Sequence, residues 1–124
     1  KNAELLVHDL GLHFQSVQLA TKDMSESMAK TIDIEVWIPS MNIYKEVSSI
    51  SNALDYQARR GNIKYRNKKT KKNEFVHTLN ASGLATSRLI PAILEQFQQK
   101  DGSVKVPKVL QKYTSFKVIK TKNK

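Results

Sequence analysis

The alternation of apolar and polar residues is clearest over residues 31–38, where it predicts a β-strand. The even-numbered positions of this segment would share one apolar face: Ile32, Ile34, Val36 and Ile38. The odd-numbered positions would share the other: Asp33, Glu35 and Trp37. Pro39 follows and should end the strand, because proline has no backbone N–H to donate to a sheet.

Weaker patterns predict further strands at residues 14–19 and 46–52, and a polar turn or one helical turn at 25–30. Residues 63–66 and 74–80 should form a hairpin around a basic loop. In its second strand one face carries Phe75, His77 and Leu79, so we expect His77 to be packed in the core rather than to bind a metal. His8, His13 and His77 also lack the spacing of metal ligands.

Helical spacing of apolar residues predicts helices at 3–10, 54–60, 84–99 and 107–113. Gly11 is a stop signal for the first. Pro91 lies inside the third and removes a backbone donor, at a cost of about 3 kcal/mol unless the helix kinks. Strands outnumber helices, and neighbouring strands can pair as hairpins. The expected fold class is therefore α+β, a mainly antiparallel sheet flanked by helices.

The chain has a large excess of basic residues, concentrated in two segments. The 124 residues carry 21 basic and 11 acidic side chains, a net charge of +10. Six of the basic residues lie within residues 64–72, and Lys117, Lys120, Lys122 and Lys124 form a basic tail over residues 114–124. Both runs are consistent with salt-dependent contact to a polyanion or with a solvated loop and a frayed end.

The chain has no cysteine, no signal peptide pattern and no apolar run near the ~20 residues needed to cross a bilayer. We therefore expect a cytoplasmic protein without a membrane partner.

Three segments could carry chemistry. In the first, Glu46 and nearby hydroxyls such as Ser49 could hold Mg²⁺, which prefers oxygen ligands. Glu46 and Ser49 are three residues apart, so a straight strand would send them to opposite faces, and only a bulge or loop entry would let them converge. The alternative is an ordinary exposed strand.

The second segment places Thr78, Asn80 and Ser82 on one face of a strand, where they could grip a small polar ligand. Gly83 would let the backbone turn into the next helix. In the third, Arg88 lies in the first turns of an apolar helix, where its guanidinium could bind phosphate oxygens. The alternatives are a solvent-facing strand and a structural ion pair.

The order and spacing of these segments resemble seryl-tRNA synthetases of the bacterial type, within the class II aminoacyl-tRNA synthetases. The resemblance rests on DIEVW (33–37), YKEVSSISN (44–52), DYQARR (55–60), FVHTLNASG (75–83), LATSR (84–88) and QQKDGSVKVP (98–107). It covers residues 5–113, so we expect 1–113 to be the C-terminal portion of the class II catalytic domain and 114–124 a basic tail.

This resemblance implies an enzyme that activates serine with ATP, requires Mg²⁺, transfers the seryl group to tRNA(Ser) and is a homodimer. By the family's pattern, ATP would be bound by Glu46, Val47, Ser48, Ser49 and Arg88. Arg88 would be the catalytic arginine on the γ-phosphate, and Glu46 and Ser49 would hold the metal ion. Serine would be bound by Asn80 and Ser82, with Thr78 close by.

Ala81 and Ser87 stand where the family usually has glycine, and residues 23–28 depart from its usual glycine-containing stretch. The family's first and second motifs and its tRNA-binding arm do not occur in these residues, so we expect the chain to be inactive alone. Two other hypotheses remain: a non-catalytic paralogue acting as a binding or dimerisation module, and a basic RNA-binding domain.

Overall fold

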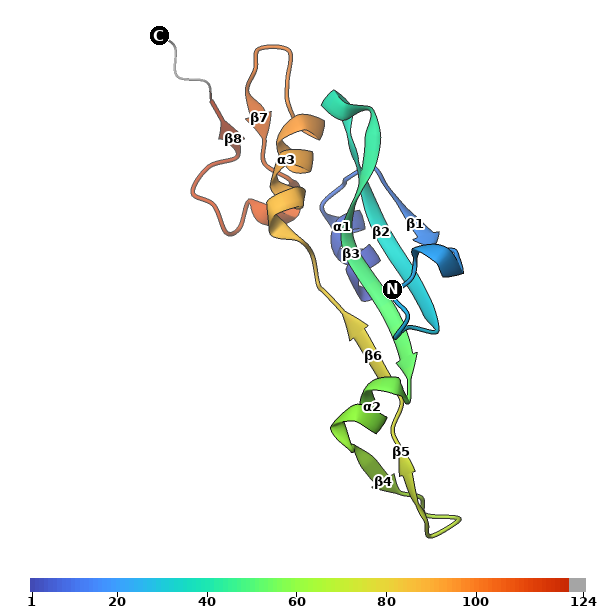
Figure 1. Cartoon of the computed structure of the whole chain (residues 1–124). Coiled ribbons are helices and arrows are strands. Elements are labelled where there is room, and N and C mark those ends of the chain that lie inside the picture. Colours follow the sequence, from blue (N-terminus) through green and yellow to red (C-terminus); the bar gives the residue numbers. More distant parts are fainter. Residues whose placement is uncertain (121–124) are drawn as a thin grey trace. The chain divides into compact units, whose positions relative to one another are not determined.

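The computed structural model describes residues 1–120 of the chain. Its helices are α1 (Asn2–Asp9), α2 (Tyr56–Gly61) and α3 (Thr86–Gln96), with 3-10 turns η1 (Thr21–Asp23), η2 (Pro39–Met41) and η3 (Lys108–Leu110) (Figure 1). Its strands are β1 (Phe14–Gln18), β2 (Lys30–Ile38), β3 (Ile43–Leu54), β4 (Lys64–Arg66), β5 (Asn73–Phe75), β6 (Thr78–Ala81), β7 (Val104–Lys105) and β8 (Val118–Ile119).

The main sheet has four strands in the order β1-β2-β3-β6. β3 and β6 pair antiparallel, with Ser51 opposite Asn80 and Ile50 opposite Ala81. Two further antiparallel pairs, β4–β5 and β7–β8, form small separate sheets. The fold class is therefore α+β with antiparallel pairing, as the sequence predicts.

The chain divides into two compact units, which are described separately. The first, here the helical unit, comprises residues 1–16, 34–48 and 83–124. The second, here the hairpin unit, comprises residues 17–33 and 49–82.

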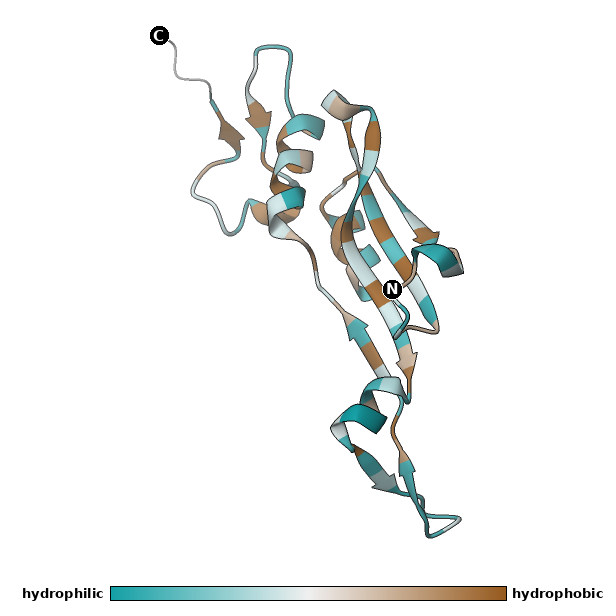
Figure 2. Ribbon diagram, in the orientation of Figure 1, coloured by the Kyte–Doolittle hydropathy of each residue, from teal (hydrophilic) through white to brown (hydrophobic). Residues whose placement is uncertain are grey.

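Apolar side chains from strands and helices form the core of the helical unit. The predicted apolar face of β2 is covered at Ile34, Val36 and Ile38, and Figure 2 shows the alternating colours along this strand. Val7 of α1 and Ala92 of α3 have no exposed surface. Burial of this apolar surface is the main term that stabilises the unit.

Side-chain amides and carboxylates fix α3 against the strand ends of the helical unit. The amide of Gln96 donates to the Trp37 carbonyl at 2.7 Å and accepts from the His13 N–H at 2.7 Å. Glu95 accepts from both the N–H and the hydroxyl of Ser40, at 2.8 Å each. These bonds satisfy strand-end groups and set the position of the helix.

The hairpin unit has a smaller and more polar interior. Its buried apolar residues are Ala53 and Ala58, whereas three polar residues are also buried: Thr31, Asp33 and Ser51. Figure 2 shows that α2, β4 and β5 are mostly hydrophilic. With so little apolar surface to bury, this unit depends more on hydrogen bonds.

Several predicted elements differ from the structure. The strand predicted at 74–80 is two strands, because β5 pairs with β4 while β6 pairs with β3, which is distant in sequence. His77 lies between them and is exposed, so its predicted place in the core is wrong. The helix predicted at 107–113 is a single 3-10 turn, η3, held by the Leu110 N–H on the Pro107 carbonyl.

Three smaller details also differ. In α1 the covered positions are Ala3 and Val7, while Leu5 and Leu6 are each 51% exposed. Gly83 is not among the glycines with positive φ, and a Cβ there would meet open space, so no conformational need for glycine exists at this turn. In the predicted basic tail, β8 pairs with β7, while Lys122 and Lys124 lie outside the described residues.

Candidate functional site

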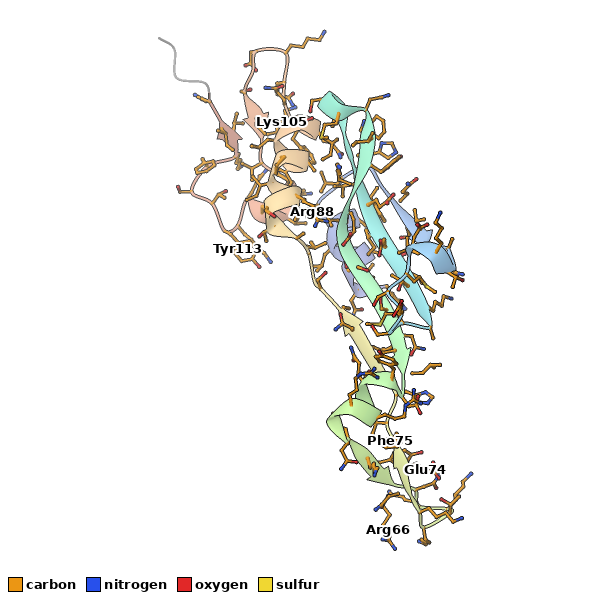
Figure 3. The ribbon with its side chains drawn as sticks, viewed as in Figure 1. Arg66, Glu74, Phe75, Arg88, Lys105 and Tyr113 are labelled. Carbon is orange, nitrogen blue, oxygen red and sulfur yellow. The ribbon has the colours of Figure 1, made fainter. Side chains whose placement is uncertain are left out.

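Arg88 and Glu46 contact each other within the helical unit. Arg88 lies in the first turn of α3, whose start is tied to β3 by the Ala85 N–H on the Val47 carbonyl at 2.6 Å. The Arg88 Nη1 donates to the Glu46 carbonyl oxygen at 2.6 Å and lies 3.6 Å from the Glu46 carboxylate. Figure 3 labels Arg88 at the beginning of α3. The strand and the helix start thus hold one cation and one carboxylate together.

This pair remains accessible to a ligand. The side chains of Arg88 and Glu46 are 51% and 41% exposed. An ion pair this exposed contributes little to stability, so a bound anion can take the place of the carboxylate at modest cost. The arrangement is suited to holding an anionic oxygen with the free edge of a guanidinium.

A cavity of about 370 Å³ also borders Arg88 in the helical unit. Its lining includes a second cation, Lys45, and the side chains of Ser87 and Glu95. Our interpretation of the sequence did not include Lys45, since a single lysine on a strand carries no signal without its neighbours from α3.

Val47 and Ser48, the predicted neighbours in the nucleotide site, have no exposed surface in the structure. The Val47 carbonyl accepts the Ala85 N–H. Any part these two residues take in nucleotide binding would therefore be to shape the strand rather than to offer side chains.

In the hairpin unit, small polar residues gather on adjacent strands. Asn80 on β6 lies opposite Ser51 on β3, and the Ser82 N–H donates to the Ser49 carbonyl at 3.4 Å. Asn80 and Ser82 are exposed. Asn80 and Ser82 can therefore offer an amide and a hydroxyl to a small polar ligand.

Thr78, the third residue of that predicted face, has a local partner. Its hydroxyl donates to the Gln57 side-chain oxygen of α2 at 2.8 Å. The register between β3 and β6 also shifts between Asn52 and Leu54, next to the point where Thr78 pairs. These contacts give Thr78 a structural task in linking α2 to β6.

The polar face continues onto β2, which the sequence interpretation did not assign to a site. Thr31 and Ser51 share a buried hydroxyl–hydroxyl hydrogen bond of 2.9 Å. Asp33 follows two residues later and is only 8% exposed, and its Oδ1 is buried without a hydrogen-bond partner in the described part of the chain. The alternation placed Asp33 on the polar side of β2, but nothing in the sequence showed that this position is buried.

A buried carboxylate oxygen without a partner is costly and uncommon in native structures. Such groups concentrate where strain or a missing ligand has a function. Asp33 therefore joins the candidates of the hairpin unit, beside Thr31 and Ser51.

The described residues contain no cluster of three or more histidine, cysteine, aspartate or glutamate side chains that could hold a metal ion. His13 instead packs against Trp37 and Tyr44, and accepts or donates a 2.9 Å hydrogen bond with the Tyr44 hydroxyl. Glu46 is the carboxylate that contacts Arg88. Within residues 1–120, no helix is both long and apolar enough to span a membrane.

Comparison with protein families gives a match over residues 1–97 to the tRNA synthetase class II core domain (G, H, P, S and T). Serine--tRNA ligase 2 of Clostridium acetobutylicum is 69% identical over 111 residues, which are 90% of this chain and 26% of that protein. Serine--tRNA ligase of Thermotoga petrophila is 56% identical over 119 residues, 96% of this chain and 28% of that protein.

Solved structures give the same result. Seryl-tRNA synthetase from Pyrococcus horikoshii complexed with ATP has a TM-score of 0.90 and 48% identity, over 95% of this chain and 26% of that one. Cytoplasmic serine-tRNA ligase from Naegleria fowleri in complex with AMP has a TM-score of 0.86 and 39% identity, over 98% of this chain and 29% of that one. The chain therefore spans between a quarter and a third of the relatives it matches.

Proposed function

The chain belongs to the tRNA synthetase class II core domain family (G, H, P, S and T), and on that basis we propose that it is the C-terminal part of the catalytic domain of a serine--tRNA ligase. The observation that carries this proposal is the 69% identity, over 90% of this chain, to a serine--tRNA ligase. The contact between Arg88 and Glu46 supports it, because two residues expected at a nucleotide site lie together.

The proposed reaction has two steps. A carboxylate oxygen of serine attacks the α-phosphorus of ATP, forming seryl-adenylate and releasing pyrophosphate. A hydroxyl of the terminal ribose of the tRNA then attacks the seryl carbonyl, and AMP leaves. No protein nucleophile is needed, so the protein contributes positioning and electrostatic stabilisation.

Arg88 has the role of binding the γ-phosphate in this proposal. Its guanidinium offers several N–H donors in a plane, which suits phosphate oxygens, and it would exchange its exposed carboxylate partner for the nucleotide. Glu46 and Ser49 are proposed as the protein ligands of Mg²⁺. A metal ion held there would neutralise part of the triphosphate charge. ATP and AMP in the two related structures support nucleotide binding at this fold.

Asn80 and Ser82 have the role of selecting serine. Serine is small, so discrimination must come from hydrogen bonds to its hydroxyl and ammonium groups. A site built from polar groups rejects an analogue without the hydroxyl, because its own donors and acceptors would then be left unpaired. Asn80 on β6 and Ser82 just after it are both exposed, which is consistent with such a task.

The proposal extends to the complete protein. We expect a cytoplasmic homodimer that acts on tRNA(Ser), with its other motifs and tRNA-binding arm in segments beyond these 124 residues.

The experiment is serine-dependent exchange of labelled pyrophosphate into ATP by the complete synthetase, followed by charging of tRNA(Ser). We expect exchange with serine and only weak exchange with alanine, which lacks the hydroxyl. Exchange that is independent of serine, or faster with another amino acid, would refute the assignment.

A further inference from the structure

Six cationic side chains crowd one end of the hairpin unit. The basic hairpin is here defined as residues 62–76, which include β4, β5 and their connection. Its cations are Lys64, Arg66, Lys68, Lys69, Lys71 and Lys72. All six are exposed, and Figure 3 labels Arg66 on β4 and Glu74 and Phe75 on β5.

The charge of the basic hairpin is not neutralised internally. Glu74 is its one acidic residue, so the six cations and one carboxylate leave a net charge of +5. Within residues 1–120 none of the six cations forms an ion pair, whereas Arg59 on the neighbouring α2 is paired with Asp55 at 2.6 Å. Lys64 lies over the Phe75 ring at 4.7 Å, and the other five cations face solvent.

Glu74 is used to shape the hairpin instead. Its carboxylate accepts hydrogen bonds from the Tyr65 hydroxyl at 2.9 Å, the Asn67 amide at 2.9 and 3.0 Å, and the Thr70 hydroxyl at 2.9 Å. These bonds, that from Asn67 most strongly, lower the pKa of Glu74, so the carboxylate stays ionised at neutral pH. The same contact raises the pKa of Tyr65 and keeps its phenol protonated.

The loop between the strands is also held by its own backbone. The Asn67 side-chain oxygen accepts the N–H groups of Lys69 and Thr70, at 2.9 and 3.2 Å. The Asn67 N–H donates to the Lys72 carbonyl at 2.9 Å, and Lys71 adopts a left-handed conformation with φ of 57°. The lysines are therefore presented from an ordered turn, which lowers the entropy lost when a partner binds.

We propose that the basic hairpin binds the phosphate backbone of RNA, and that in the complete protein this RNA is the tRNA substrate. The identification of the RNA rests on the proposed function, whereas the affinity for phosphates follows from the uncompensated charge. Backbone contacts of this kind position the nucleic acid and carry no base sequence information.

The composition of the hairpin favours RNA over an anionic membrane. Surface-seeking segments combine basic residues with exposed apolar side chains that enter the bilayer boundary. In the basic hairpin Phe75 is half-buried beneath Lys64, and the Tyr65 hydroxyl is engaged by Glu74. Ile63 and Tyr65, at 52% and 47% exposed, are its large exposed hydrophobic residues, and two such side chains do not make an apolar face that enters a bilayer.

The test uses the complete synthetase with four loop lysines neutralised: Lys68→Gln, Lys69→Gln, Lys71→Gln and Lys72→Gln. These changes leave Glu74 and its three donors in place. The matched control removes the same charge from exposed lysines of the helical unit: Lys105→Gln, Lys108→Gln, Lys112→Gln and Lys117→Gln.

Affinity for a tRNA(Ser) transcript is measured over a series of salt concentrations, together with the KM for tRNA in charging. We expect the hairpin variant to bind about tenfold more weakly at low salt, with a shallower slope of log Kd against log salt, since each lost phosphate contact removes ~0.7–0.9 from the slope. We expect the control variant to change affinity by less than about twofold.

Pyrophosphate exchange separates this inference from the proposed function, because that step needs no tRNA. If the wild-type synthetase shows no serine-dependent pyrophosphate exchange, the proposed function is refuted. Normal exchange together with an unchanged tRNA affinity in the hairpin variant overturns the inference alone. An equal loss of tRNA affinity in the hairpin variant and the control variant also overturns the inference, since the lower net charge would then be the cause. The inference would likewise be overturned if the hairpin variant no longer bound phosphatidylserine vesicles while its affinity for tRNA was unchanged.

Discussion

Arg88 illustrates at the scale of single residues how a site can be assembled before its ligand arrives. Its guanidinium is oriented by a 2.6 Å hydrogen bond to the Glu46 carbonyl, while the carboxylate is farther away at 3.6 Å. The backbone contact fixes direction, and the exposed carboxylate provides a counter-charge that a phosphate can replace. Orientation and charge are thus supplied by different atoms of the same residue.

Replacement of Arg88 in the complete synthetase should therefore slow serine activation. We expect Arg88→Ala to lower the exchange rate roughly 100-fold, the usual effect of losing one preorganised donor to developing charge. Arg88→Lys keeps the charge but loses the planar guanidinium, so its exchange rate should lie between those of the wild type and Arg88→Ala. Lys105→Ala is the matched control. An exchange rate for Arg88→Ala equal to that of the control would contradict the assigned role.

A second prediction concerns serine selection by Ser82, the residue after β6. We expect Ser82→Ala to raise the KM for serine about tenfold and the KM for ATP by no more than about twofold, because a lost hydrogen bond to a substrate costs ~1–2 kcal/mol. The measurement is exchange with each substrate titrated separately. Ser115→Ala, at an exposed position, is the control. Equal changes in both KM values would show that Ser82 supports the fold rather than serine.

Sequence patterns found these residues unevenly. The period of two in residues 78–82 led to the prediction of a polar face, and the strand itself, β6, covers Thr78–Ala81. Asp33 was placed on the polar side of its strand but not in a site, since its significance depends on burial and on Oδ1 having no hydrogen-bond partner within residues 1–120. Those are properties of the folded neighbourhood, which one strand's sequence does not contain.

At the scale of elements, local and long-range pairing were not equally predictable. β2 follows directly from alternation over residues 31–38. The break between β5 and β6 does not, because it depends on β6 joining β3 across more than twenty residues of intervening chain. His77 shows the consequence. Its pattern suited a core position, but the break leaves it exposed.

The buried hydroxyl pair between β2 and β3 leads to a prediction about stability. Thr31→Val and Ser51→Ala should each destabilise the complete synthetase by ~1–2 kcal/mol, because each leaves the other hydroxyl buried without its partner. The double variant should lose less than the sum of the two, by about 1 kcal/mol. Thermal unfolding of the four proteins measures this coupling. Strictly additive losses would show that the two hydroxyls do not depend on each other.

The basic hairpin leads to a prediction about pH. Hydrogen bonds lower the pKa of Glu74, so its contribution is complete above the pKa of an unperturbed glutamate and is lost as pH falls through the lower, folded value. We expect amide exchange in residues 67–71, corrected for the intrinsic rate, to accelerate over that acidic window. In Glu74→Gln protection should already be reduced at neutral pH and should not change over the window. A wild-type profile that is flat there would show that the carboxylate does not order the turn.

At the scale of the whole molecule, the distribution of exposed apolar side chains agrees with a chain that is part of a larger protein. Leu79 and Tyr113 are 77% and 76% exposed, and Ile90 on α3 is 57% exposed. Single exposed side chains of this size also occur on complete proteins. The direct indication is the share of its relatives that the chain spans, 26% to 29%.

The isolated chain should consequently fail to form seryl-adenylate. The chain supplies Arg88, the arginine proposed to bind the γ-phosphate. The arginine expected to bind the α-phosphate lies in the family's second motif. Loss of one phosphate-binding group costs several kcal/mol of transition-state stabilisation, and loss of a whole wall of the pocket removes the geometry that the remaining groups require. The measurement is serine-dependent pyrophosphate exchange by the 124-residue chain, with the complete synthetase as positive control and circular dichroism to establish that the chain is folded. Exchange by a folded isolated chain would show that residues 1–124 hold a sufficient site, and that the second motif is not needed for activation.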